Sequence, residues 1–369
     1  VTEGLYLLSL NISPYAGDAF HQPPLILGFF QLLSSDVAIR IFYITLDILG
    51  AFLLKETIVL YQKTHADWLK KKRDDSKTKK QVEMLNSRYT TIILPNLPII
   101  AASLYLFNPF TFGTCIAKST ISINNFFVIL SLHQALKGHT HISMLALSLS
   151  SYLTFYTAIL IPPLSLLNQK RSIFYQTMVF SVYTGALQYV SFLMMGSWDY
   201  LYDTYGFILL VPDLTPNIGI FWYFFTEVFK HFREFFLFAY QYHVFIYTIP
   251  MYIRLRPYPM LTFWVSVAII SAFKSYPAFG DIALQMAFLP LIFDDVKASR
   301  FGILLVITTI YCVILAPIFW NMWIYSATGN ANFYYAINLV LTVSQVLLIT
   351  DAIALVLKDE YLFKKAARD

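Results

Sequence analysis

Charged side chains are scarce in this sequence. Of its 369 residues, 13% are Asp, Glu, Lys or Arg and 58% are hydrophobic, with a mean hydropathy of +0.61. Soluble globular proteins carry about 25% charged residues, so this chain has too few polar side chains to cover a surface that faces only water. The composition excludes a soluble globular protein and predicts an all-α protein that crosses a membrane several times.

Cysteines and catalytic motifs are also few. The two cysteines, Cys115 and Cys312, cannot form a disulfide framework, and we interpret both as small buried apolar residues. The sequence contains no G-x-S-x-G, H-E-x-x-H, glycine-rich phosphate loop or C-x-x-C. His139 and His141 stand two residues apart in a polar turn, where capping a helix is a better interpretation than binding metal. We therefore predict no catalytic residue, no metal site and no cofactor.

The net charge of +5 comes from one segment. Residues 61–88 hold nine basic and four acidic side chains, and nine minus four equals the whole excess. The basic ones are Lys63, Lys70, Lys71, Lys72, Arg73, Lys77, Lys79, Lys80 and Arg88; the acidic ones are Asp67, Asp74, Asp75 and Glu83. Because the segment lies between hydrophobic runs, positive-inside sorting explains it better than binding to nucleic acid. We predict a basic cytosolic loop and no nucleic-acid partner.

The hydrophobic runs predict about eleven membrane crossings when every other basic cluster also faces the cytosol. A spanning helix needs about 20 apolar residues, and residues 37–60 and 89–107 are the first two such runs. One span over residues 142–167 would leave Lys170 in the lumen. We therefore expect two short helices there, broken near residues 155–157 and buried in protein at the break.

The chain as a whole is predicted to be one transmembrane helical domain covering residues 1–369. Its longest lumenal segment is expected at residues 196–233, and its C-terminus carries basic residues that belong in the cytosol by the same rule.

Polar side chains gather in five predicted lumenal loops. They are Asp18, His21, Lys118, Asn124, Asp213, Asn217, Lys274, Asp281, Asn330 and Asn332. Unsatisfied polar groups at membrane depth are costly, so these residues need partners or a ligand, and we predict that they line one cavity. The alternative for any single residue is structural, as a helix cap or turn residue, or as an ion pair between Lys274 and Asp281.

The stretch VPDLTPNIGIFWYFF, residues 211–225, joins such a polar turn to a run of aromatic residues. Aromatic rings favour the membrane interface, and we predict that Trp222 and Phe224 contact a partner protein there.

The same loops resemble a known family. SPYAGDAFHQPPLI, CIAKSTISINN, the VPDLTPNIGIFWYFF stretch, AFKSYPAFGDIALQMAFLP and WIYSATGNANFYYAI are similar to PIG-U, a subunit family of the glycosylphosphatidylinositol (GPI) transamidase of the endoplasmic reticulum. The resemblance runs over essentially the whole chain outside the basic segment, and its longest motifs are long enough to be specific to this family.

The resemblance implies a non-catalytic subunit of the complex that attaches GPI to proteins. The cysteine nucleophile of that reaction belongs to another, protease-like subunit, which would be a partner together with the remaining subunits. The family is related to the GT-C glycosyltransferases, which implies a GT-C-like helical bundle with short broken helices. It also implies recognition of the GPI lipid, or of the attachment signal of the precursor protein.

Within this interpretation, SATGNANFYY is our preferred contact with the GPI headgroup. Gly329 lets the backbone approach a bulky glycan, and Asn330 and Asn332 offer uncharged donors and acceptors. Phe333 and Tyr334 follow at the depth where acyl chains begin. The alternative is that one of the two asparagines caps the final helix.

The competing function is a GT-C mannosyltransferase that uses a dolichol-phosphate sugar. Such enzymes carry an acidic motif in the first lumenal loop, commonly Asp-x-Asp. Residues 1–24 contain only two acids, Glu3 and Asp18, and no Asp-x-Asp occurs in the sequence, so this enzyme is disfavoured. A solute transporter is less favoured still, because no inverted repeat is detectable.

Overall fold

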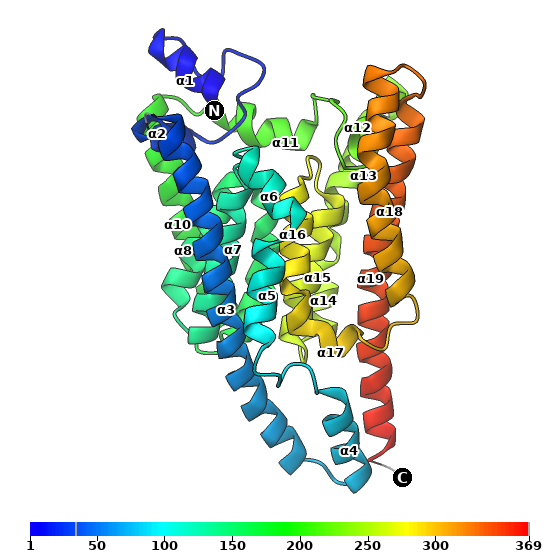
Figure 1. Ribbon diagram of the computed structural model, residues 1–369. Helices are drawn as coiled ribbons and strands as arrows, with labels where there is room; N and C mark the ends of the chain where they lie inside the picture. Colours follow the sequence, from blue (N-terminus) through cyan, green and yellow to red (C-terminus); the bar gives the residue numbers. More distant parts are fainter. Residues whose placement is uncertain (34, 368–369) are drawn as a thin grey trace.

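A computed structural model describes residues 1–33 and 35–367, and within these ranges every regular element is a helix. Figure 1 shows α3 on one side of the bundle, α18 and α19 on the other, and α15 and α16 between them. The α-helices are α1 (Thr2–Ser9), α2 (Pro24–Leu32), α3 (Asp36–Asp74), α4 (Lys79–Arg88), α5 (Leu97–Leu106), α6 (Pro109–Ile116), α7 (Ile121–Lys137), α8 (Thr140–Leu153), α9 (Ile161–Leu167), α10 (Ile173–Met195), α11 (Phe207–Leu210), α12 (Phe221–Glu227), α13 (Arg233–Ile246), α14 (Thr248–Arg254), α15 (Pro259–Phe273), α16 (Phe279–Phe288), α17 (Phe293–Val296), α18 (Gly302–Trp320) and α19 (Ala331–Lys365).

Among residues 1–33 and 35–367, four helices are long and apolar enough to cross a membrane. They are α3, α10, α19, and α18 with its π-helical continuation to Tyr325; α5 and α6, bent by 44° at their junction, make a fifth if counted together. The predicted eleven crossings are therefore not confirmed. Most other apolar runs form shorter helices, and α15, only 15 residues long, is buried almost throughout. At 1.5 Å per residue such a helix is shorter than the roughly 30 Å hydrocarbon layer, and hydropathy alone does not separate it from a span.

The break expected near residues 155–157 is confirmed. Helix α8 ends at Leu153, Thr154 is extended, and a 3₁₀ helix over Phe155–Leu160 leads into α9. The buried hydroxyl of Thr157 lies at this break, donating to the Thr154 carbonyl oxygen at 3.1 Å and contacting Ser150 Oγ at 3.0 Å. Protein groups thus satisfy the interrupted backbone, as an irregular segment at membrane depth requires.

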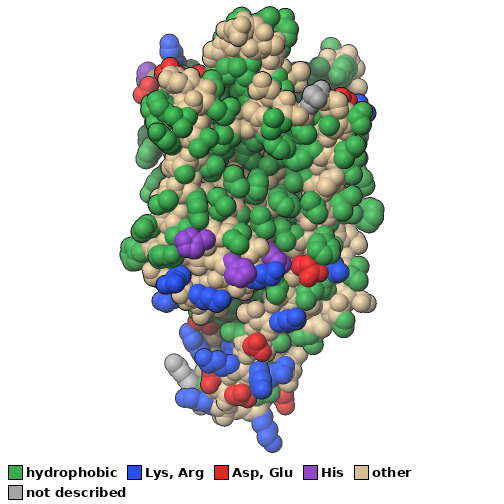
Figure 2. Space-filling model, turned by 90° about the vertical axis from the view of Figure 1, so that its left-hand side faces the viewer, with side chains coloured by type: hydrophobic (Ala, Val, Ile, Leu, Met, Phe, Trp, Pro, Cys, Tyr) green, Lys and Arg blue, Asp and Glu red, His purple; other side chains and the backbone are tan. Residues whose placement is uncertain are grey.

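The segment expected as a basic loop is mostly helical. Helix α3 continues to Asp74 and α4 begins at Lys79, so residues 75–78 alone connect them. The α4 residue Gln81 donates to the Phe363 carbonyl oxygen at 3.0 Å, which holds α4 against the end of α19. Figure 2 shows most Lys and Arg side chains gathered at this end of the molecule, which we call the basic end. We call the other end of the bundle the far end.

At the basic end, Asp294 of α17 secures the segment that follows α4. Its carboxylate accepts hydrogen bonds from the backbone N–H groups of Thr91 at 3.0 Å and Ile92 at 2.8 Å, and from Lys297 Nζ at 2.9 Å. Burial opposes ionisation of Asp294, but the hydrogen bonds from Lys297 and the two N–H groups outweigh it and hold the pKa below the usual 3.8.

We expect Asp294→Ala to lower the free energy of unfolding by about 3 kcal/mol, because the backbone N–H groups of Thr91 and Ile92 lose their acceptor. Thermal unfolding in detergent measures the change, with the exposed Asp75→Ala as control. Because the folded pKa is depressed, this contribution is present at neutral pH and is lost only as the pH falls below about 3.8. Equal unfolding temperatures for wild type and Asp294→Ala would contradict the assignment.

Candidate functional site

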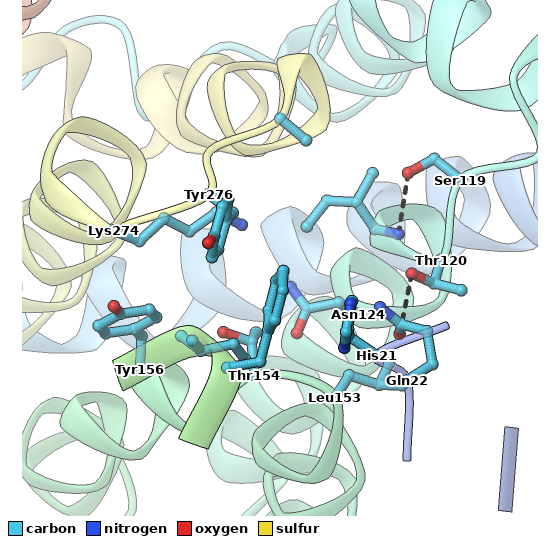
Figure 3. Close-up of a pocket in the computed structure, with 14 residues that line it drawn as sticks. His21, Gln22, Ser119, Thr120, Asn124, Leu153, Thr154, Tyr156, Lys274 and Tyr276 are labelled. Carbon is cyan, nitrogen blue, oxygen red and sulfur yellow. Dashed lines mark hydrogen bonds between the residues drawn. The ribbon is translucent and has the colours of Figure 1, made fainter. Parts of the chain in front are cut away.

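A small polar cavity of about 240 Å³ lies at the far end of the bundle. Figure 3 shows its labelled side chains, which come from segments far apart in the sequence. The lining residues include His21, Gln22, Ser119, Thr120, Asn124, Leu153, Thr154, Tyr156, Phe207, Lys274 and Tyr276. They belong to the loop before α2, the turn before α7 and the start of that helix, the break after α8, the start of α11, and the loop between α15 and α16.

Three stacked rings form part of the cavity wall. The His21 ring lies 3.5 Å from that of Phe207, and the Phe207 ring lies 5.1 Å from that of Tyr276, with interplanar angles of 12° and 17°. The His21 ring is fixed between two backbone carbonyl oxygens, with Nδ1 2.9 Å from that of Asp203 and Nε2 3.0 Å from that of Asp18. The Asp18 side chain itself is exposed. The stack presents aromatic surface beside polar groups, an arrangement that suits a ligand with both kinds of face.

Tyr276 also links this wall to the 211–225 stretch. Its hydroxyl donates to the Asp213 carbonyl oxygen at 3.0 Å. Burial raises the pKa of Tyr276 and the nearby Asp213 carboxylate raises it further, so the hydroxyl stays protonated at neutral pH.

Lys274 and Asp281 form a buried ion pair beside the cavity. Lys274 Nζ lies 2.6 Å from Asp281 Oδ2, and that oxygen also accepts from the backbone N–H of Ala278 at 2.7 Å, at the start of α16. The structural interpretation of this pair is therefore confirmed, while Lys274 also lines the cavity. A paired ammonium gives the cavity a polar group without an uncompensated charge.

Asn124 and Asn125, at the start of α7, form hydrogen bonds that join this helix to α8 and α16. Asn124 is buried, and its side-chain oxygen accepts from Ser150 Oγ at 2.7 Å. Asn125 Nδ2 donates to the Gly280 carbonyl oxygen at 2.8 Å. A Cβ at position 280 would lie 2.6 Å from Ile121 Cγ2, so α16 approaches α7 this closely only with glycine there.

Several cavity residues were missed from the sequence. Thr154 and Tyr156 lie at the helix break, whose position was predicted although its lining role was not. The Tyr156 hydroxyl donates to Gln241 Oε1 at 2.6 Å and accepts from the Ser275 N–H at 3.3 Å, which holds the 274–278 loop over the break. A polar break beside a lumenal loop is the signal that would have identified them.

Asp213, Asn217, Asn330 and Asn332 form a second group outside this cavity, and Lys118 forms an ion pair with Asp36 away from both. Asp213 and Asn217 act mainly in their own turn: Asp213 Oδ1 accepts from the Thr215 N–H at 2.8 Å, and Asn217 Oδ1 accepts from the Gly219 N–H at 2.8 Å. Asn338 of α19 donates to the Asn217 carbonyl oxygen at 2.6 Å. Backbone carbonyl oxygens of this turn thus accept hydrogen bonds from Asn338 of α19 and from Tyr276 in the loop between α15 and α16. The side chains of Asp213 and Asn217 mainly form hydrogen bonds within the turn itself.

Both asparagines of SATGNANFYY have partners within the chain. Asn330 is the N-cap of α19, and its side-chain oxygen accepts from the Asn332 N–H at 3.0 Å, so the capping alternative is confirmed for it. The side-chain oxygen of Asn332 accepts from the Tyr223 hydroxyl. Phe333 is 47% exposed, whereas Tyr334 is buried. These contacts bind α19 to α12 and leave the headgroup role of the segment a prediction.

Trp222 is buried within this chain. It is 3% exposed, and its ring lies 5.9 Å from that of Trp323, with Tyr334 and Tyr335 also in contact. Phe224 is half-buried and stacks on Tyr240 at 4.7 Å. The aromatic run thus packs α12 against α13, α18 and α19, and a contact of Trp222 with a partner stays a prediction.

Fold and site together define a multi-pass helical membrane protein with a basic end and, at the far end, a polar cavity lined by hydroxyl, amide and aromatic groups. The PIG-U family model, described as GPI transamidase subunit PIG-U, matches residues 1–341. This chain belongs to the PIG-U family of GPI transamidase subunits.

Individual relatives agree with this assignment. The GPI-anchor transamidase component PIGU of Homo sapiens is 39% identical over 376 residues, covering 98% of this chain and 85% of the human protein. The GPI transamidase component GAB1 of Saccharomyces cerevisiae is 31% identical over 363 residues, covering 97% of this chain and 84% of the yeast protein. The predicted family membership is therefore confirmed.

Proposed function

We propose that this chain is a non-catalytic subunit of the GPI transamidase complex in the endoplasmic reticulum membrane, and that its far-end cavity holds part of the GPI headgroup. The observation that carries the proposal is the cavity of about 240 Å³ with stacked rings, hydroxyls, a buried amide and a neutralised lysine on its walls. Sugar rings present hydroxyl groups at their edges and C–H groups on their faces, and this lining offers a partner for each.

The size of the cavity limits what enters it. Small-molecule pockets usually measure roughly 300–1,000 Å³, so about 240 Å³ accommodates one portion of a glycolipid headgroup, with the rest outside. Phe207, Leu153 and Ile208 give the same cavity an apolar side. We therefore propose that the glycan lies against the stacked rings of His21 and Tyr276 and hydrogen-bonds to the hydroxyl of Thr154.

We favour this cavity over the SATGNANFYY segment as the headgroup contact because polar side-chain atoms of that segment already form hydrogen bonds within the chain. The side-chain oxygens of Asn330 and Asn332 already accept hydrogen bonds within the chain. In the cavity, the hydroxyl of Thr154 has no hydrogen-bond partner among the described residues. Phe333, exposed beside the second group, is then proposed as a lipid-chain contact.

The proposed protein partners are the other subunits, including the protease-like subunit that carries the cysteine nucleophile. Phe224 is half-buried, and the exposed rings of Phe229 and Phe232 follow it. Aromatic side chains are enriched at protein interfaces, which supports an interface on this side of α12.

Filling the cavity tests the headgroup proposal. Thr154 is extended and half-buried, so Thr154→Phe would add a ring to the cavity with little disturbance of the backbone. We expect GPI that co-purifies with the complex, measured by lipid mass spectrometry, to fall about tenfold, as the loss of one or two hydrogen bonds predicts.

Thr350→Phe on the exposed side of α19 is the matched control and should leave bound GPI unchanged. Recovery of the other subunits is measured on the same samples to show that assembly is intact. An assembled Thr154→Phe complex with undiminished GPI would refute binding in this cavity. Loss of the precursor's attachment signal with GPI retained would identify that peptide as the occupant instead.

A further inference from the structure

A second cavity, of about 400 Å³, lies toward the basic end, between the α7–α8 turn and the segment before α10. Its lining includes His139, His141, Lys170, Arg171 and Tyr175, with Gly138 beside them. Figure 2 shows His side chains beside Lys and Arg side chains along the lower edge of the apolar surface on this side of the molecule. The cavity has no part in the headgroup site proposed above.

The positive charge of this cavity is not neutralised by the protein. No carboxylate lines it, and neither Lys170 nor Arg171 forms an ion pair within residues 1–33 and 35–367. Lys170 Nζ lies 3.4 Å from the Lys137 carbonyl oxygen, and the Arg171 guanidinium lies 5.2 Å from the Tyr175 ring centre. Two adjacent cations in a concave surface with no counter-charge attract an anion.

Backbone N–H donors face the same space. His141 is held between the hydroxyls of Tyr175 at 3.0 Å and Tyr183 at 3.3 Å. His139 is the N-cap residue of α8 and makes no side-chain capping bond, so the first N–H groups of this 14-residue helix are left for another acceptor. The cavity therefore combines two cations with backbone N–H donors at a helix N-terminus, which is the chemistry that phosphate oxygens require.

Apolar surface begins directly beside the cavity. Ile142 lines it, and Leu145 is exposed one turn further along α8. On α10, one of the four membrane-spanning candidates, Phe174 is 85% exposed and Met178 is also exposed. A ligand bound here has its anionic group at the start of a span and can lay apolar chains along that span.

We infer that this cavity binds the phosphate of an anionic phospholipid from the membrane leaflet at the basic end. The test uses the full chain in its native complex, reconstituted into nanodiscs of phosphatidylcholine with or without phosphatidylserine, and measures retained lipid by native mass spectrometry. Wild type is expected to retain phosphatidylserine in preference to phosphatidylcholine. Lys170→Gln with Arg171→Gln is expected to weaken that retention about thirtyfold, as the loss of two cations at a membrane surface predicts.

Two further variants make the result specific. Lys170→Arg with Arg171→Lys keeps both charges and should retain the lipid. Lys70→Gln with Lys71→Gln removes the same charge from the extension of α3, outside the cavity, and should also retain it. Equal loss in this last variant would overturn the site in favour of a general basic surface. Displacement of the lipid by inorganic phosphate at equal concentration would overturn the phospholipid assignment.

Discussion

Lys274→Met is expected to destabilise the chain by about 3–5 kcal/mol, the usual effect of removing one partner from a buried ion pair. The substitution leaves the Asp281 carboxylate buried in the first turn of α16, where the Ala278 N–H is its one remaining hydrogen-bond donor among the described residues. We expect a large fall in the unfolding temperature in detergent, and poor recovery of the assembled complex.

A double variant distinguishes the contribution of Lys274 to stability, through its ion pair, from a contribution to ligand binding in the cavity. Lys274→Met with Asp281→Asn removes both charges while an acceptor remains for the Ala278 N–H, so most of the lost stability should return. If the refolded double variant still binds less GPI, Lys274 contributes to the ligand as well as to the fold. An unfolding temperature that stays as low in the double variant as in the single one would contradict the ion-pair explanation.

Trp222→Ala is the second substitution for which we expect a large effect. Truncating a buried Trp to Ala costs about 3–5 kcal/mol, and Trp222 contacts Trp323, Tyr334 and Tyr335 within this chain. The expected result is a lower unfolding temperature of the chain by itself, because α12 loses its packing against α18 and α19.

Two variants control for this effect. Trp222 Nε1 is buried without a hydrogen-bond partner among the described residues, so Trp222→Phe should keep most of the stability. Trp198→Ala, at a tryptophan that is 47% exposed, should be nearly neutral. A Trp222→Ala chain that unfolds at the wild-type temperature yet loses its partner subunits would support the interface role first predicted for Trp222.

Local sequence was sufficient to predict several features of this protein. Scarce charge and long apolar runs determined the membrane-embedded, all-helical class, and the loop motifs determined the family. The position of Lys170 after a single apolar run indicated the broken span. The structural alternatives, a cap at one of the two asparagines and an ion pair between Lys274 and Asp281, were also readable from the sequence. Each of these depends on residues within a few turns of each other, where chain geometry already brings them together.

Tertiary structure alone decided which apolar helices are covered by protein and which polar loops meet. The α15 sequence is as apolar as a span, yet its neighbours enclose it, and that enclosure depends on helices far away in the chain. The cavity likewise joins His21, Asn124 and Lys274, while Asn330 lies outside it. Side chains separated by a hundred residues or more are brought together only when the helices pack, and no local preference of either segment specifies that meeting.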